Sequence, residues 1–207
     1  MKLTSDEALK LLDNSRGLAE DDNWITHCIC VGNSAGKIAQ KLNLDEDFAK
    51  TLGYIHDIGK RDGYDNKIKH ELRGYDYILK LGYDKEYASI CITHSFLNND
   101  INCVAGGVPS KDIYKYDFMK EYVENHEYTI YDKIVNLCDL MCKYNTMTLE
   151  KRIIEIMLRR GCHENTVYHI TEAQKLKLEI DNLLGCSVYS LFDDISSLIF
   201  FISYLLS

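Results

Sequence analysis

Proline is almost absent from this chain: Pro109 is the only one among 207 residues, and glycine occurs 12 times. Because these two residue types break helices most effectively, their scarcity favours long helices. The sequence also lacks a convincing alternation of polar and apolar residues, an internal repeat or a low-complexity tract. We therefore predict an all-α fold in a single domain, residues 1–207.

Positive charge is in deficit, with 24 Lys and Arg against 32 Asp and Glu and a net charge of −8. An acidic surface repels a phosphate backbone, so we expect no nucleic-acid partner. A metal ion can still supply local positive charge for a small phosphorylated substrate. The oligomeric state is left open, with a homodimer as one alternative.

Long apolar runs are missing as well. The N-terminus has no signal-peptide core, and the apolar run 195–206 is much shorter than the roughly twenty residues that span a bilayer. We expect a cytoplasmic protein without a membrane partner, in which this run forms a buried terminal helix; a membrane anchor or a docking helix is the alternative. In a reducing compartment the eight cysteines are expected as free thiols. Cys138 and Cys142 have the spacing of a zinc pair, but no second pair completes such a site.

Capping residues and apolar periodicity divide the chain into helices. The segment 97–117 loses this periodicity and contains Gly106, Gly107 and Pro109, so we expect a loop there. The helices are expected at 4–17, 24–42, 45–55, 67–81, 84–96, near 118, and at 131–144, 148–160, 171–185 and 188–206.

The string GYIHDIGK places His56 and Asp57 at the end of an apolar helix. A buried imidazole beside a buried carboxylate is costly unless a partner such as a divalent cation compensates it. His27 lies beside the apolar face of the preceding helix, and Asp139 lies inside the apolar run KIVNLCDLMC. Taken alone, His27 also fits a packed or surface histidine, and Asp139 also fits a helix cap or a salt bridge.

In chain order, His27, His56-Asp57 and Asp139 resemble the H…HD…D signature of the HD superfamily of metal-dependent phosphohydrolases, and His56 to Gly59 match its HDIG subgroup. The resemblance covers about residues 24–145. It implies an HD-domain helical bundle, with a C-terminal helical extension over about 148–207.

Two further histidines, His70 and His94, resemble the second-metal ligands of the dinuclear branch. With Gly74, the arrangement is similar to the bacterial symmetrical dinucleoside-tetraphosphate hydrolases, although the stretch between His94 and Asp139 is longer here. The resemblance implies two divalent ions per chain, drawn from Fe, Mn, Zn, Ni or Mg. It puts one ion on His27, His56 and Asp139 and the other on His70 and His94, with Asp57 bridging them.

The implied reaction is the cleavage of a nucleotide or another small phosphoester or phosphoanhydride by water that the metal ions activate. Asp57 and Lys60 are the catalytic candidates. Lys60 follows Asp57 by three residues and is a candidate phosphate contact, or else a solvated lysine at a helix end. Arg73 is a second candidate for phosphate. The alternatives are an HD-type diiron oxygenase with the same ligands and a nucleotide sensor without turnover. His126, His163 and His169 match nothing in the pattern and are expected to be non-catalytic.

Overall fold

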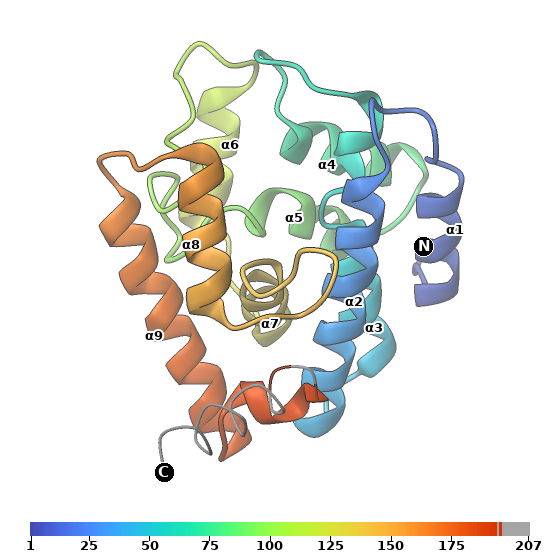
Figure 1. Ribbon diagram of the computed structural model, residues 1–207. Helices are drawn as coiled ribbons and strands as arrows, with labels where there is room; N and C mark the ends of the chain where they lie inside the picture. The colour runs from blue at the N-terminus through green and yellow to red at the C-terminus, as the bar shows by residue number, and fades with distance from the viewer. Residues whose placement is uncertain (194, 196–207) are drawn as a thin grey trace.

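The computed structural model describes residues 1–193 and 195, so most of the predicted helix 188–206 lies outside the described residues. Within them the chain is all-α, as predicted, and contains two isolated β-bridges but no strand. The α-helices, shown in Figure 1, are α1 (Ser5–Asp13), α2 (Asn23–Lys41), α3 (Glu46–Ile55), α4 (His70–Lys80), α5 (Lys85–Thr93), α6 (Tyr116–Asn125), α7 (Ile130–Asp139), α8 (Leu149–Arg160) and α9 (Thr166–Leu184). Two 3₁₀ helices, η1 (Ile58–Asp62) and η2 (Val188–Leu191), complete the described elements.

Local capping explains where several helices begin. The Thr4 side chain accepts a hydrogen bond from the amide of Glu7, and the Asp45 carboxylate accepts one from the amide of Phe48. Thr148 caps α8 in the same way. A cap satisfies amides that have no partner inside the helix, so it fixes the first turn. The predicted starts near these three residues are confirmed.

Two other predicted boundaries are wrong. Helix α9 begins at Thr166 and not at Thr171, whose hydroxyl donates to the carbonyl of Val167 inside the helix. The predicted helix 131–144 ends at Asp139. Nε of Arg152 donates a hydrogen bond of 2.8 Å to the carbonyl of Cys142, which holds the chain after α7 in a turn.

The predicted helices 67–81 and 84–96 are shorter in the structure. Helix α4 begins at His70 because the Asp65 carboxylate accepts the amides of Lys67 and Ile68 in a turn. Helix α5 ends at Thr93, after which the amide of Leu97 binds the carbonyl of Cys103. The loop predicted at 97–117 is present as irregular chain up to α6, which begins slightly earlier than expected.

Helix α7 lies in the middle of the molecule, with α2 and α3 on one side and α8 and α9 on the other (Figure 1). Helices α2 and α3 approach most closely at two glycines, where a Cβ added to Gly53 would lie 2.5 Å from Cα of Gly32. Side chains with no exposed area, such as Ile25, Ile55 and Val135, fill the space between the helices. No helix of the described chain combines the length and hydropathy needed to cross a bilayer. All eight cysteines are free thiols.

Candidate metal centre

The six side chains that the sequence singles out as ligands meet at one place, and each stands at or near the end of a helical element. Their donor atoms form three overlapping groups, and within each group the atoms lie within 4.8 Å of one another. The ends of helices thus bring together residues that are up to 112 positions apart. The groups are His27, His56 and Asp57; His56, His94 and Asp139; and Asp57, His70 and His94.

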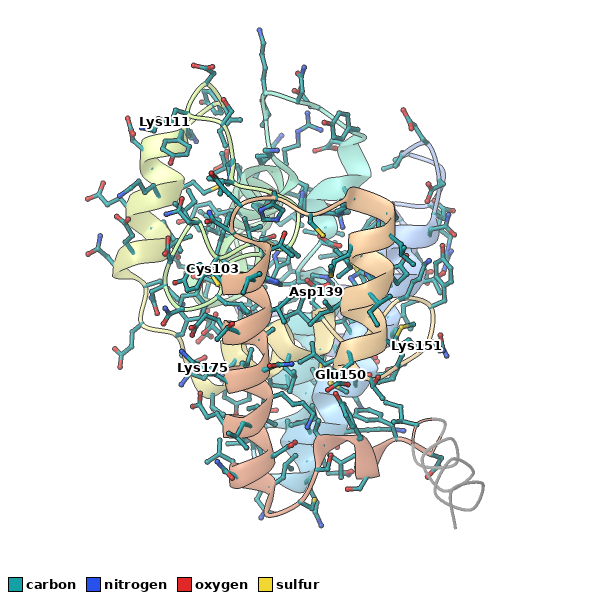
Figure 2. All side chains as sticks on the ribbon, turned by 60° about the vertical axis from the view of Figure 1, so that its left-hand side comes forward. Cys103, Lys111, Asp139, Glu150, Lys151 and Lys175 are labelled. Carbon is teal, nitrogen blue, oxygen red and sulfur yellow. The ribbon has the colours of Figure 1, made fainter. Side chains whose placement is uncertain are left out.

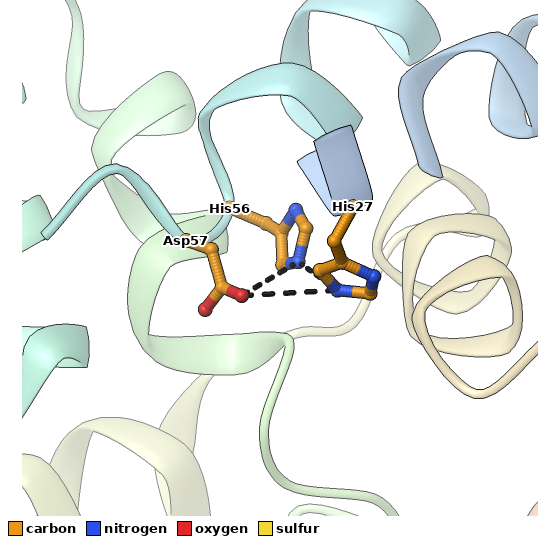
Figure 3. Close-up of side chains that lie close together, drawn as sticks. All are labelled: His27, His56 and Asp57. Atoms are coloured by element: carbon orange, nitrogen blue, oxygen red, sulfur yellow. Dashed lines mark hydrogen bonds and ion pairs between the residues drawn. The ribbon is translucent and has the colours of Figure 1, made fainter. Parts of the chain in front are cut away.

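One half of the centre is formed by α2, α7 and the turn after α3. Nε2 of His27 lies 2.8 Å from Oδ1 of Asp139 and 3.2 Å from Nε2 of His56. Oδ2 of Asp57 lies 3.4 Å from Nε2 of His56 and 3.7 Å from Nε2 of His27 (Figure 3). These four donors surround one small volume.

The other half faces the second oxygen of the same aspartate. Oδ1 of Asp57 lies 3.0 Å from Nε2 of His70 and 3.4 Å from Nε2 of His94. The two carboxylate oxygens of Asp57 therefore face two different sets of imidazoles. This is the arrangement that a carboxylate needs in order to bridge two cations.

Backbone carbonyls orient two of the imidazoles. Nδ1 of His56 donates to the carbonyl of Gly53 at 2.7 Å, and Nδ1 of His94 donates to the carbonyl of Ile90 at 3.0 Å. Because a carbonyl only accepts, the proton must sit on Nδ1 in both rings. The lone pairs on Nε2 then point into the centre, which is the usual orientation of metal-binding histidine.

Glu71 orients the third imidazole, and sequence reasoning missed it. Its Oε2 lies 3.1 Å from Nδ1 of His70, and its Oε1 accepts a hydrogen bond of 3.0 Å from Oγ of Ser95. Burial raises the pKa of Glu71, but the nearby His70 and His94 lower it by more, so Glu71 is ionised. The sequence signal for this role was the position of Glu71 directly after His70. An acidic residue there is also expected simply because negative charge is favourable at the start of a helix.

The donor set fits divalent metal ions. Within residues 1–193 and 195, Oδ1 of Asp57 makes no hydrogen bond, although Asp57 is only 1% exposed. A buried carboxylate oxygen without a donor is strongly unfavourable. A cation would satisfy it, and imidazole and carboxylate together suit Fe, Mn, Zn or Ni.

The charges of the centre are set by its own members. Burial raises the pKa of Asp57, but the charge of Lys60 and the facing His56 hold it well below the usual range. Burial likewise raises the pKa of Asp139, but the hydrogen bond from His27 and the charges of His27, His56 and His94 together lower it by more. For Lys60, burial lowers the pKa, and the contact of its Nζ with Oδ2 of Asp57 raises it by more. Both carboxylates are ionised and the lysine is charged at neutral pH.

Five of the six candidate ligands, all except His56, line a cavity of about 790 Å³, which Lys60 also lines. Arg73 is not among the described residues that line it. Its guanidinium donates to the carbonyls of Asp62 and Gly63 and pairs with Asp65 at 2.9 Å. The structure therefore does not bring Arg73 to the site, because its donors hold the loop before α4.

The other histidines and the cysteine pair lie apart from the ligand groups. His169 lines the cavity from α9, and burial lowers its pKa to about 4. His126 lies 3.5 Å from Asp132, away from the ligands. Among the described residues no cysteine belongs to a metal-ligating group, so the zinc pair finds no support; Cys142 instead contacts Ser34 at 3.4 Å.

The fold and the site define an all-helical protein with a buried histidine–aspartate centre. The HD domain model matches residues 24–157, most of the chain, so this protein belongs to the HD domain family. The predicted family is confirmed, whereas the HDIG subgroup and the dinucleoside-tetraphosphate branch are not.

Curated relatives carry the name Ribonuclease Y. Identity is 37% over 67 residues for the protein of Protochlamydia amoebophila, which is 32% of this chain and 13% of that protein. It is 32% over 89 residues for Oleidesulfovibrio alaskensis, covering 42% of this chain and 17% of that protein. The protein of Lactobacillus helveticus is 31% identical over 101 residues, 49% of this chain and 16% of its own length. The chain thus spans less than a fifth of these relatives. No solved structure gives a significant match.

Proposed function

We propose that this protein is a metal-dependent phosphohydrolase that cleaves a nucleotide or another small phosphoester or phosphoanhydride. The observation that carries the proposal is the double role of Asp57, whose two oxygens face two separate sets of imidazoles. One ion would be held by His27, His56, Asp57 and Asp139, and a second by Asp57, His70 and His94.

Divalent ions held in this way would lower the pKa of bound water toward neutrality and would neutralise charge on the phosphoryl oxygens. The chain supplies the fixed geometry. Carbonyls hold His56 and His94, Glu71 faces His70, and Lys60 contacts Asp57. Because Lys60 also lines the cavity, its charge lies where a phosphoryl group at Asp57 would need it.

A second candidate is cleavage of phosphodiester bonds in RNA, and the name of the curated relatives favours it. The net charge of −8 argues against binding a long phosphate backbone. The comparisons nevertheless leave the expected absence of a nucleic-acid partner unsupported. Substrate choice therefore has to be measured directly.

The test is hydrolysis by the full chain loaded with Mn²⁺, Fe²⁺, Zn²⁺ or Ni²⁺. The substrates are p-nitrophenyl phosphate, mononucleotides, diadenosine tetraphosphate and a short RNA. Asp57→Asn should lower turnover at least about 1,000-fold and lose metal at the same time. The exposed Asp62→Asn in the same turn is the matched control and should behave like the wild type. Absence of hydrolysis with every metal would refute the proposal, and oxygen consumption by the iron form would favour the oxygenase alternative.

A further inference from the structure

A second set of charged side chains lines the same cavity, on α8 and on the turn that precedes it. The set consists of Lys143, Arg152, Arg159 and Arg160, here called the α8 cation cluster. None of these residues belongs to the candidate metal centre, and α8 lies on another side of α7 from α2 and α3 (Figure 1).

The cluster has too little negative charge to balance it. Lys143 lies 2.8 Å and Arg159 3.5 Å from Oε1 of Glu155, and Arg152 contacts the other oxygen. Three cations thus share one carboxylate, which does not itself line the cavity. Burial raises the pKa of Glu155, and the hydrogen bond from Lys143 and the charge of Arg152 lower it by more, so Glu155 is ionised.

Arg160 adds a fourth positive charge. In the described part of the chain, no carboxylate pairs with it. Its guanidinium lies against Gly106 of the 97–115 loop, so closely that a Cβ on Gly106 would overlap Nη1. The loop and α8 therefore meet at a guanidinium, and the glycine leaves the room for it.

Such a grouping is unfavourable without an anion, because like charges at short range repel one another. Arg152 is only 7% exposed, and its Nε is fixed on the carbonyl of Cys142 at 2.8 Å. A rigid, partly buried guanidinium beside other cations is well suited to phosphate, which accepts paired N–H donors.

We propose that the α8 cation cluster binds a second anionic group of the substrate while the metal centre holds the phosphoryl group that is cleaved. The substrate class is then a small molecule with at least two phosphoryl groups, such as a nucleoside polyphosphate. A cavity of about 790 Å³ is within the range of small-molecule sites. This inference rests on the proposed function.

The main test compares KM for adenosine tetraphosphate and for p-nitrophenyl phosphate in the metal-loaded full chain. Arg160→Gln removes the unpaired charge, and Gly106→Ala displaces the same guanidinium without changing any charge. In both variants, KM for the tetraphosphate should rise about tenfold more than KM for p-nitrophenyl phosphate.

Lys151→Gln is the matched control. Lys151 is exposed on α8 and does not line the cavity. In the view of Figure 2 its side chain is on the outer side of α8, whereas Asp139 of the metal centre is drawn between α8 and α9. Both KM values should stay at the wild-type level in this variant. Equal KM changes for the two substrates in Arg160→Gln and Gly106→Ala would overturn the inference and leave the proposed function standing. If the same two variants change KM more for a short RNA than for the tetraphosphate, the inference is overturned, because the cluster then binds RNA.

A binding measurement separates the two proposals. Calorimetry with inorganic tripolyphosphate, which needs no turnover, should give about tenfold weaker binding to Arg160→Gln than to the wild type. If the wild type hydrolyses nothing but this difference is seen, the proposed function fails and the anion site stands. Equal tripolyphosphate binding by the two proteins contradicts the anion site whatever the activity.

Discussion

Gly59 lies in η1, two residues after Asp57, and its missing side chain lets α4 approach the metal centre. A Cβ at this position would overlap the carbonyl oxygen of His70 and would lie 2.5 Å from the amide nitrogen of Gly74. Both atoms belong to the backbone of α4, so they cannot move aside alone. To reach the ordinary contact distance of about 3.4 Å from both atoms, the helix has to shift by about 1 to 1.5 Å.

This shift predicts the effect of Gly59→Ala. Overpacking of this kind costs about 1–3 kcal/mol of the free energy of unfolding. It also moves His70, whose Nε2 lies 3.0 Å from Oδ1 of Asp57. A misplacement of about 1 Å lowers turnover roughly 100-fold. We therefore expect a lower Tm, loss of the metal ion on the His70 side and much slower hydrolysis, measured by thermal unfolding, elemental analysis and steady-state kinetics.

The matched control is Gly36→Ala in α2. The three atoms nearest to a Cβ there all belong to the flexible side chain of Lys50, with Cγ at 2.7 Å. Because alanine is better than glycine in a helix by about 1 kcal/mol, the Tm should be unchanged or higher. Wild-type metal content and Tm in Gly59→Ala would show that α4 does not need the missing side chain, and equal losses in both variants would show that the effect is not specific to this contact.

Two further predictions concern side chains around the site. Glu71→Gln should weaken metal binding about 10- to 100-fold in a chelator competition, because Glu71 faces Nδ1 of His70; unchanged affinity would remove Glu71 from this role. His169 binds a proton below a pKa of about 4 when folded and about 6.5 when unfolded. The unfolded state thus holds more protons between these values, and stability falls as the pH drops through this window, by up to about 1.4 kcal/mol per unit. His169→Gln should reduce this slope in denaturant unfolding of the metal-free protein; an identical slope contradicts the assignment.

Local signals were sufficient to predict most of the helices. The caps at Thr4, Asp45 and Thr148 act within three residues of themselves, so they can be read directly from the chain. The end of α7 could not be read in this way. It depends on Arg152, which lies ten residues after Cys142 and donates a hydrogen bond to its carbonyl.

In the site, too, some residues could be predicted from the sequence and others could not. Its six candidate ligands carry a recognisable order and spacing, and the structure brings them together. The α8 cation cluster has no such pattern, because it arises when α8 packs beside the 97–115 loop and places Arg160 on Gly106. Arg73 shows the reverse case. Its spacing from His70 suits a phosphate contact, but in the structure its guanidinium pairs with Asp65 at 2.9 Å and does not line the cavity.

The metal content of the chain is the most direct measure of whether the histidine–aspartate centre holds two ions. Protein purified without a tag or chelators is measured by elemental analysis, together with His94→Ala and Asp57→Asn. If Asp57 bridges two ions, the wild-type chain should contain two, His94→Ala about one and Asp57→Asn fewer than one. A wild type that binds no metal, or an Asp57→Asn variant that binds as much as the wild type, would contradict this bridging role.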